Sequence, residues 1–331
     1  MKQIVCQEPN VLEEKHTALP TIQEKEILLK IKRIGICGTD LHAYKGNQPF
    51  FQYPRVLGHE ISGEIEEPNG FTAFKKGDRA AVIPYIACGS CHPCLKGKRN
   101  CCQNLEVIGV HRDGGMSEYL AVPAENIILT NDLSFEEAAL LEPLSIGMHA
   151  ITRSRLQKDD TVVVIGAGPI GLGAGLFAKQ NGNKVIILDQ SRERLQFAKK
   201  WTGADDIITV DGTAEKALQN KADIVFDATG SRQSMIQAFE YVSYGGTLVY
   251  VGLVKDNITF FDPDFHKKEI TLMGSRNARL EDFKKVKQAI QNGSVGIESY
   301  TTHRISFDKL KDEYQSLYHP KENMIKALVT L

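Results

Sequence analysis

The chain has 331 residues, which is long enough for two domains with separate cores. A hydrophobic content of 42%, a charged content of 24% and a single Trp are typical of a globular protein. The formal net charge of -1 offers no basic surface to nucleic acid or to an anionic membrane, so we expect neither as a partner. The start, MKQIVCQEPN, lacks the apolar segment of a secretory signal, and we therefore expect a cytoplasmic protein.

Residues 1–150 contain short apolar runs separated by Gly and by turn-forming residues. Strands are predicted in EILLKIKRIGI, GHEISGEIEE, GDRAAVIPY and EYLAVP, and short strands of this kind are typical of a β-rich domain. The end of the chain is similar, with an amphipathic helix expected in FDKLKDEYQSL and a last strand in IKALVTL. We therefore expect residues 1–150 to form one domain that residues 290–331 complete.

Residue types that bind metals are grouped in this first part. The segment GICGTDLH contains Cys37 and His42, and the segment GHE contains His59 and Glu60. Further along, Glu142 begins the segment EPL. A catalytic zinc takes three protein ligands and an open position, which a Cys, a His and a carboxylate would supply. Each residue alone has a structural alternative, such as a buried free Cys or a core His, but a metal centre explains them together.

Four further cysteines have the spacing C-x2-C-x2-C-x7-C, which can surround one tetrahedral ion; they are Cys88, Cys91, Cys94 and Cys102. The total of seven cysteines is odd, and together with the missing signal it favours metal-bound thiolates over a disulfide framework. Four thiolates leave no open position, so we expect a structural zinc. Cys101 and His92 are alternative ligands beside the four.

Beyond residue 150, strands and helices alternate. Strands are predicted at 161–168 and 184–189, followed by helices at 169–180 and 192–203. The runs DDIITV, ADIVFDATG, GTLVYVG and EITLMGS continue the series. Near-continuous apolar strands that alternate with helices indicate a parallel sheet covered on both faces. We therefore expect an α/β domain over residues 151–289.

The first loop of this α/β domain matches G-x-G-x-x-G, with the residues Gly166, Ala167, Gly168, Pro169, Ile170 and Gly171. The first glycine permits a tight turn, the second lets the backbone approach a pyrophosphate, and the third lets the helix pack closely on the strand. The helix N-terminus adds N–H donors and a positive potential. The motif predicts a dinucleotide site, and a purely structural strand–turn–helix is the alternative.

Asp189 ends the next strand, where an acidic residue binds the ribose hydroxyls of a dinucleotide. Its charge would repel a 2′-phosphate, so the sequence favours NAD over NADP. Arg192 and Arg194 lie close by and weaken that preference, and Arg194 is itself a candidate for cofactor binding. The structural alternative for Asp189 is a cap of the following helix.

The motifs GICGTDLH, GHEISGEI, NCC, EPLSIGMHA and VVVIGAGPIGL occur in order along the chain. With them the whole chain resembles the zinc-dependent medium-chain dehydrogenases of the polyol and threonine dehydrogenase branch. This resemblance implies a GroES-like catalytic domain and a Rossmann domain. It also implies that Cys37 and His59 bind the catalytic zinc, that Glu60 or Glu142 completes the shell, and that the other carboxylate holds the zinc-bound water.

The resemblance further implies oxidation of a secondary alcohol to a ketone, with hydride transfer to NAD. Zinc would lower the pKa of the alcohol, and Thr39 would pass its proton by way of the nicotinamide ribose to His42 near solvent. The nicotinamide site is expected at Val251, Gly252, Leu253 and Ser275. A zinc-free reductase on the same fold and a catalytically silent NAD-binding scaffold are the competing classes, which the intact ligand and relay residues disfavour.

The segments GNQPFFQYPRVLGHE, AVIPYIACGSC, IGVHRDGG and DPDFHKKEITLMGSRNA resemble those of enzymes that oxidise sugar acids. The resemblance implies oxidation of L-galactonate to D-tagaturonate, with a neutral polyol such as sorbitol or xylitol, or L-threonine, as alternatives. Arg276 could bind a substrate carboxylate through two hydrogen bonds, or instead a polyol hydroxyl. Further candidates for the substrate pocket are Asn277, His111, Phe50 and Phe51.

The resemblance also implies a homodimer or homotetramer. GTLVYVG and the alternating segment NITFFDPD are expected to form a sheet edge at which subunits could pair.

Overall fold

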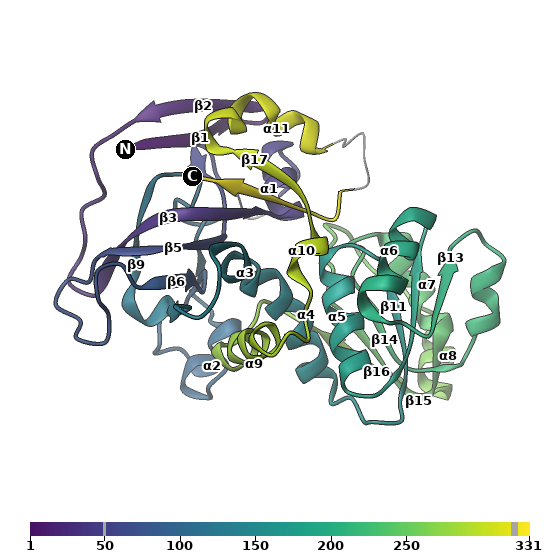
Figure 1. The fold of residues 1–331 in the computed structure, drawn as a ribbon. Coiled ribbons are helices and arrows are strands. Elements are labelled where there is room, and N and C mark those ends of the chain that lie inside the picture. The colour runs from purple at the N-terminus through teal and green to yellow at the C-terminus, as the bar shows by residue number, and fades with distance from the viewer. Residues whose placement is uncertain (49–50, 319–323) are drawn as a thin grey trace. The chain divides into compact units, whose positions relative to one another are not determined.

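The computed structural model describes residues 1–48, 51–318 and 324–331. The chain forms two compact units, one made of Met1–Glu142 with Arg279–Leu331 and the other of Pro143–Ala278 (Figure 1). The domain limits predicted at residues 150 and 290 lie near these limits without coinciding with them. None of the helices in the described ranges is both long and apolar enough to span a membrane.

The first unit is built around a mixed sheet in the order β10-β6-β5-β3-β18-β17, with β9 also paired to β3. All its strand pairs are antiparallel except β17 and β18, which are parallel. Strand β18 from the C-terminal end of the chain pairs antiparallel with β3, so the two ends of the chain share one sheet. Smaller sheets have the orders β2-β1-β4 and β7-β8. The strands are β1 (Lys2–Glu8), β2 (Val11–His16), β3 (Glu26–Ile36), β4 (Arg55–Val56), β5 (Glu60–Glu67), β6 (Arg79–Val82), β7 (Tyr85–Ile86), β8 (Glu106–Val107), β9 (Tyr119–Pro123), β10 (Ile127–Leu129), β17 (Thr301–Ser306) and β18 (Lys326–Thr330).

The core-facing residues of these strands recur with a period of two, although β3 and β18 are largely buried on both faces. Ile27, Leu29 and Ile31 of β3 are almost fully buried and lie on one face of the sheet, as a period of two requires. The predicted strand GDRAAVIPY is wrong as one element, because β6 ends at Val82 and β7 begins at Tyr85. The helices of this unit are short: α1 (Gly38–Tyr44), α2 (His92–Leu95), η1 (Arg99–Cys101), η2 (Ala124–Asn126), α3 (Phe135–Ala139), α9 (Leu280–Gln291), α10 (Ile297–Tyr300), η4 (Phe307–Lys309) and α11 (Leu310–Tyr318).

The second unit contains a six-stranded sheet in the order β13-β12-β11-β14-β15-β16, and every pair of neighbours is parallel. Val162, Val163 and Val164 are all fully buried although successive side chains point to opposite faces, so both faces of the sheet are covered. This confirms the predicted doubly covered parallel sheet. The elements are α4 (Leu141–Ser154, its first two residues in the first unit), β11 (Thr161–Ile165), α5 (Pro169–Gln180), β12 (Lys184–Asp189), α6 (Arg192–Thr202), β13 (Asp206–Thr209), η3 (Ala214–Leu218), β14 (Ala222–Asp227), α7 (Arg232–Tyr241), β15 (Val242–Tyr250), α8 (Asp262–Lys267) and β16 (Thr271–Gly274).

The expected sheet edge in GTLVYVG is wrong. That segment belongs to β15, which pairs with β14 on one side and with β16 on the other, so β16 is the edge strand. The segment NITFFDPD is not a strand either, because residues 257–261 are irregular and α8 follows at once. Asp262 and Asp264 in the first turn, with Pro263 between them, suit the start of a helix.

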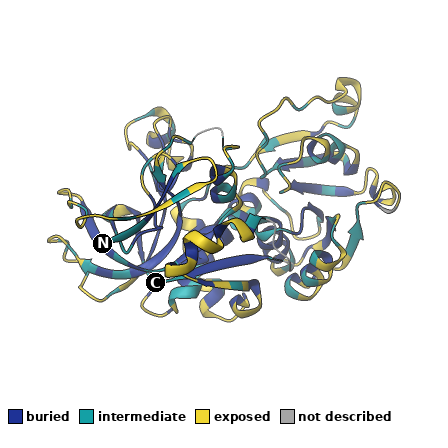
Figure 2. Ribbon diagram, turned by 90° about the horizontal axis from the view of Figure 1, so that it is seen from above, coloured by how far each residue is buried: buried dark blue, intermediate teal, exposed yellow. Residues whose placement is uncertain are grey.

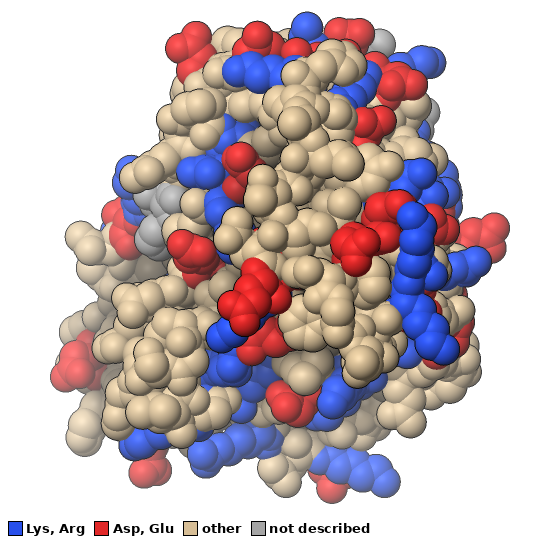
Figure 3. Space-filling view, turned by 90° about the vertical axis from the view of Figure 1, so that its left-hand side faces the viewer, with Lys and Arg blue, Asp and Glu red and all other residues tan. Residues whose placement is uncertain are grey.

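Burial and charge follow the pattern of a globular protein. Figure 2 shows that buried residues follow the strands of both units, while exposed residues concentrate in loops and outer helix faces. Acidic and basic side chains are interspersed on the face shown in Figure 3. That mixture agrees with the formal net charge of -1.

Candidate active site

The end of β3 and the start of β5 bring three metal-binding residue types together. The two strands are antiparallel with Gly35 opposite Glu60, so Cys37, just beyond β3, meets His59 and Glu60. One ligand atom of each lies within 4.8 Å of the others. His59 and Glu60 are buried, while Cys37 is partly exposed. A thiol, an imidazole and a carboxylate at this spacing fit one zinc ion with an open position.

Asp40 holds this arrangement from the first turn of α1. Its carboxylate accepts hydrogen bonds from the backbone N–H groups of Cys37 and Gly58, both at 3.0 Å. His59 Nδ1 lies 3.4 Å from Asp40 Oδ1, too poorly aligned for a hydrogen bond. Burial lowers the pKa of His59, but the charges of Asp40 and Cys37 outweigh it and raise that pKa well above its ordinary value. A carboxylate beside the ring typically orients an imidazole for a metal, and sequence reasoning assigned Asp40 no role.

Glu60 has a cationic partner that sequence reasoning missed. Lys326 Nζ lies 2.6 and 2.9 Å from the two carboxylate oxygens of Glu60, and both side chains are buried. Lys326 also donates a hydrogen bond to the backbone carbonyl of Ile36 at 3.2 Å. Because a buried charge requires a partner, this ion pair accounts for a lysine inside the protein.

Glu142, the second candidate carboxylate, is held separately. It is buried, and its Oε1 accepts a hydrogen bond from the hydroxyl of Tyr85. Burial raises the pKa of Glu142 to about 7, and the negative charge of Glu60 contributes in the same direction. Among the described residues, the group of close ligand atoms contains Glu60 and not Glu142. Tyr85 is another residue to which sequence reasoning assigned no function.

The predicted proton relay lies on α1. Thr39 is half-buried and His42 is exposed, three residues further along the helix. Positions three residues apart share a helix face, so the two side chains are neighbours. The exposed imidazole of His42 can exchange protons with solvent. The relay role of both side chains remains a prediction.

The four-cysteine group forms a second cluster in the loops from β7 to β8. The Sγ atoms of Cys91 and Cys94 are 3.4 Å apart, those of Cys91 and Cys102 are 3.8 Å apart, and those of Cys102 and Cys88 are 3.5 Å apart. Hydrogen bonds from the backbone N–H groups of Ser90 and Cys91 lower the pKa of Cys88 to about 5, which favours a thiolate.

The fourth member of the cluster is Cys102, since its sulfur lies with the other three while Cys101 is exposed and outside the group. Four sulfur ligands fit a closed zinc shell. His92, the other alternative, is also outside the group of close ligand atoms.

The glycine-rich loop of the second unit has the conformation that the motif predicts. Gly166 has a φ of +100°, which favours glycine. A Cβ on Gly171 would lie 1.8 Å from the carbonyl oxygen of Gly166, so only glycine lets α5 start this close to the loop. Asp189 Oδ2 accepts a hydrogen bond from Ala167 N at 2.7 Å, and its Oδ1 accepts one from Ser191 N at 2.8 Å. Ser191 is the N-cap of α6. Asp189, at the end of β12, therefore joins the glycine-rich loop to the start of α6.

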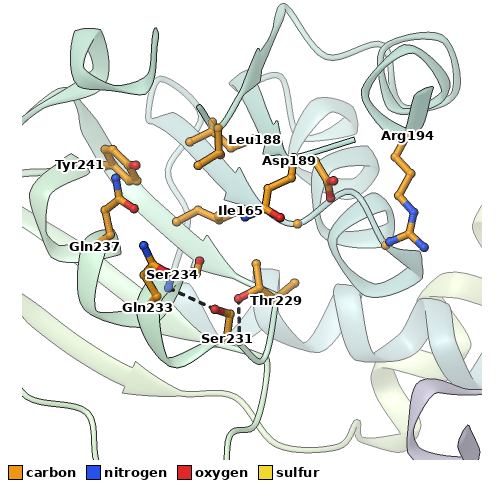
Figure 4. A pocket seen from close by; sticks show the side chains of 15 residues that line it. Ile165, Leu188, Asp189, Arg194, Thr229, Ser231, Gln233, Ser234, Gln237 and Tyr241 are labelled. Carbon is orange, nitrogen blue, oxygen red and sulfur yellow. Dashed lines mark hydrogen bonds between the residues drawn. The ribbon is translucent and has the colours of Figure 1, made fainter. Parts of the chain in front are cut away.

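A cavity of about 320 Å³ lies at this loop. Gly166, Gly168, Asp189 and Arg194 line it together with Thr229 and Ser234, among others. In Figure 4, Asp189 and Arg194 are at one end of the cavity, and Gln237 and Tyr241 are at the other. The structure therefore brings together four of the predicted cofactor residues around a space for a ligand.

Three further cofactor candidates, Pro169, Ile170 and Gly171, begin α5 and are not among the residues that line this cavity. The other candidates follow β15 and β16 and do not line it either. Val251 and Gly252 donate backbone hydrogen bonds to the carbonyl of Asp227, both at 2.9 Å, and Ser275 N donates to Tyr250 O at 2.8 Å. Leu253 is exposed. These residues extend the carboxyl edge of the parallel sheet, where ligands of such sheets bind.

The structure does not assign the substrate candidates to a site. His111 is exposed, and its Nδ1 accepts a hydrogen bond from Val107 N. Arg276 is exposed, and Asn277 has a positive φ of 54° just after β16. Phe51 packs against Tyr53 with ring centroids 4.8 Å apart, and Phe50 lies outside the described residues. Their role toward substrate remains a prediction.

Together the two units define a class of protein: a dehydrogenase with a metal centre in a β-rich unit and a dinucleotide fold in a second unit. Residues 23–132 match the family "Alcohol dehydrogenase GroES-like domain", and residues 169–292 match the family "Zinc-binding dehydrogenase". The chain belongs to this zinc-type alcohol dehydrogenase family. It is an oxidoreductase acting on CH–OH groups, as the resemblance predicted.

Relatives match the chain over nearly its full length. It is 43% identical to L-galactonate-5-dehydrogenase of Escherichia coli (strain K12), which covers 100% of this chain and 99% of that protein. It is 34% identical to sorbitol dehydrogenase of Bacillus subtilis (strain 168), and the match covers 94% of this chain and 92% of that protein. A crystal structure of the alcohol dehydrogenase RspB of Escherichia coli CFT073, complexed with cofactor NADH, matches this chain with a TM-score of 0.93 and 33% sequence identity. The match covers 100% of this chain and 99% of that chain.

Proposed function

We propose that this protein is a zinc-dependent, NAD-linked dehydrogenase that oxidises L-galactonate to D-tagaturonate. The observation that carries the zinc chemistry is the convergence of Cys37, His59 and Glu60 within 4.8 Å. The relative at 43% identity supports the sugar acid, while the sorbitol dehydrogenase at 34% identity keeps a neutral polyol as the second candidate. The cytoplasmic location and the homodimer or homotetramer predicted from the sequence stay part of this proposal.

Cys37, His59 and Glu60 would hold a catalytic zinc, which when bound polarises the alcohol oxygen of the substrate and lowers its pKa. The Tyr85 hydroxyl donates a hydrogen bond to the buried carboxylate of Glu142, and the raised pKa of Glu142 would suit that carboxylate to exchange a proton with water. Thr39 would take up the proton of the alcohol and release its own hydroxyl proton, which would reach solvent at His42. NAD, bound at the glycine-rich loop, supplies the hydride acceptor.

Arg276 is the proposed determinant of substrate class. Arg276 is exposed in the segment after β16, and the planar fork of a guanidinium binds a carboxylate through two hydrogen bonds. A hexonate offers that carboxylate and a polyol does not. The variant Arg276→Leu should therefore raise KM for hexonates at least tenfold and leave KM for sorbitol nearly unchanged. NADH production across a panel of hexonates and polyols measures this, and equal losses on both would contradict the role of Arg276.

The zinc assignment is tested at Cys37. Cys37→Ala should abolish turnover and lower bound zinc from two ions per chain to one, while NAD still binds because its cavity is lined by residues 165–241 only. Cys101→Ala, an exposed thiol outside both ligand groups, is the matched control and should keep activity and both ions. Near-normal turnover by Cys37→Ala would overturn the proposed centre.

A further inference from the structure

The ion pair between Lys326 and Glu60 connects three neighbouring strands beside the proposed metal centre. Lys326 begins β18, Glu60 begins β5, and β3 lies between them. The ammonium of Lys326 reaches both oxygens of Glu60 and the carbonyl of Ile36, so its three donors are all used. Ile36 precedes Cys37 in the chain. One buried cation therefore fixes the carboxylate and the backbone that leads to the thiol.

Gly35 provides the space for this contact. It lies in β3 opposite Glu60, and a Cβ built on it would be 1.8 Å from Glu60 Oε2, 2.8 Å from Glu60 Cβ and 2.9 Å from Glu60 Cδ. The φ of Gly35 does not fall in the left-handed region, so its backbone conformation alone does not require glycine. The requirement is steric, because the carboxylate of Glu60 that contacts Lys326 occupies the space that a side chain at position 35 would need.

The same carboxylate belongs to the group of metal-binding atoms. An oxygen of Glu60 lies within 4.8 Å of ligand atoms of Cys37 and His59. Glu60 therefore faces an ammonium and the proposed position of a divalent cation at once. A carboxylate whose charge is already partly compensated is a weaker ligand, and a buried ammonium repels a nearby cation because little solvent screens the two charges.

From these contacts we propose that Lys326 is a positioning residue that restricts Glu60 to one metal-binding oxygen and so preserves an open position for the substrate oxygen. The inference rests on the proposed zinc centre at Cys37, His59 and Glu60. Without the ammonium, the buried carboxylate loses the cation that contacts both of its oxygens. Glu60 then binds the metal through both oxygens, and the second oxygen occupies the open position.

The test compares zinc affinity, measured by chelator competition, in the wild type, Lys326→Met and Lys326→Arg. Mutation of a partner that supports a metal ligand typically lowers metal affinity 10–100-fold. Lys326 instead restrains its carboxylate, so an effect of that size is expected with the opposite sign. Lys326→Met should bind zinc at least tenfold more tightly and lose at least tenfold in kcat, and Lys326→Arg should lie closer to the wild type in zinc affinity. A purely structural role of Lys326 would instead weaken zinc binding, since the site would be less ordered.

A second readout is independent of turnover. In the cobalt-substituted protein, the visible d–d bands weaken as the coordination number rises, so Lys326→Met should show weaker bands than the wild type. Lys32→Met is the matched control: Lys32 pairs with Glu64 at 3.0 Å between the same strands β3 and β5, but this pair is partly exposed. Lys32→Met should keep wild-type zinc affinity, cobalt bands and activity.

Gly35→Ala keeps the proposal testable if Lys326→Met does not fold. The added Cβ displaces the carboxylate from Lys326 while the lysine remains, so the cobalt bands should weaken as predicted for Lys326→Met. Wild-type bands in Gly35→Ala, or zinc affinity in Lys326→Met equal to or below that of the wild type, would overturn the inference. If the wild type itself bound no zinc at Cys37, the proposed function would fail instead.

Discussion

Asp40 contacts three parts of the active site at once, which makes it the most informative single residue to change. It accepts hydrogen bonds from Cys37 N and Gly58 N and faces His59 Nδ1. In Asp40→Asn an amide donor replaces one acceptor, so one backbone N–H loses its partner and the carboxylate charge beside His59 disappears. We expect zinc affinity to fall about 10–100-fold.

The measurement for Asp40→Asn is chelator competition at fixed pH. Asp113→Asn is a suitable control, because Asp113 Oδ1 also accepts a backbone hydrogen bond, from Val56 N at 3.0 Å, but its side chain is 63% exposed. The control should bind zinc like the wild type. Unchanged zinc affinity in Asp40→Asn would show that the carboxylate does not orient His59.

At the scale of elements, the junction of β11 and α5 depends on Gly171. A Cβ added at this position would lie only 1.8 Å from Gly166 O, so Gly171→Ala forces the helix away from the glycine-rich loop. We expect NAD affinity to fall at least tenfold, as titration of NAD binding would show. Gly173→Ala in the same helix is the control, since its Cβ would meet no atom closer than 3.7 Å and alanine favours helices. Equal NAD affinity in both variants would contradict the close-packing role.

Helix α3 is tied to β17 by a two-point ion pair that gives a pH dependence. Arg304 Nε and Nη2 donate to the two oxygens of Glu136 at 3.1 and 2.8 Å. The hydrogen bond from Arg304 lowers the pKa of Glu136 below its ordinary 4.5, against a smaller opposing effect of burial. A carboxylate whose pKa is lowered by folding stabilises the protein above its unfolded pKa, and this contribution is lost as the pH falls through the folded pKa.

Glu136→Gln should therefore lower the free energy of unfolding at pH 6 by about 1 kcal/mol. The loss is no larger because solvent screens a half-exposed ion pair. The difference from the wild type should shrink as the pH is lowered below about 4.5, and urea unfolding at several pH values measures it. A difference that stays constant down to pH 3 would mean that the ion pair does not stabilise the fold.

At the scale of the whole molecule, we expect zinc to serve two separate purposes in the first unit. The four-cysteine cluster holds a segment with few buried apolar residues, so its stability depends on the metal. Cys94→Ser should lose one zinc ion per chain and make the segment around residues 88–102 sensitive to protease. Cys37→Ala, which should lose the other ion, serves as the comparison and should stay resistant there. Equal protease sensitivity in both variants would contradict a structural role for the four-cysteine cluster.

Several features could be predicted because their signals are local. The G-x-G-x-x-G loop, its flanking strand and helix, and the four cysteines each lie within one short segment, so spacing alone indicates their geometry. Helix α5 has the limits 169–180 that the sequence predicts. The error at GTLVYVG has the opposite cause: whether a strand is internal or at the edge depends on the order of the strands, and β15 has the same apolar character in either place.

The sequence by itself determined the two kinds of domain and the candidate residues of both metal clusters. Periodicity and the four-cysteine spacing are properties of a continuous segment, and the segments of Cys37 and His59 carry the family resemblance. Only the tertiary structure decided which groups hold those ligands. Lys326 meets Glu60 across 266 residues of chain, and Tyr85 meets Glu142 across 57. Such pairs depend on strand order and register, so no local pattern in the sequence specifies them. The ligands of this enzyme are therefore visible in its sequence, and the residues that position them are visible only in its fold.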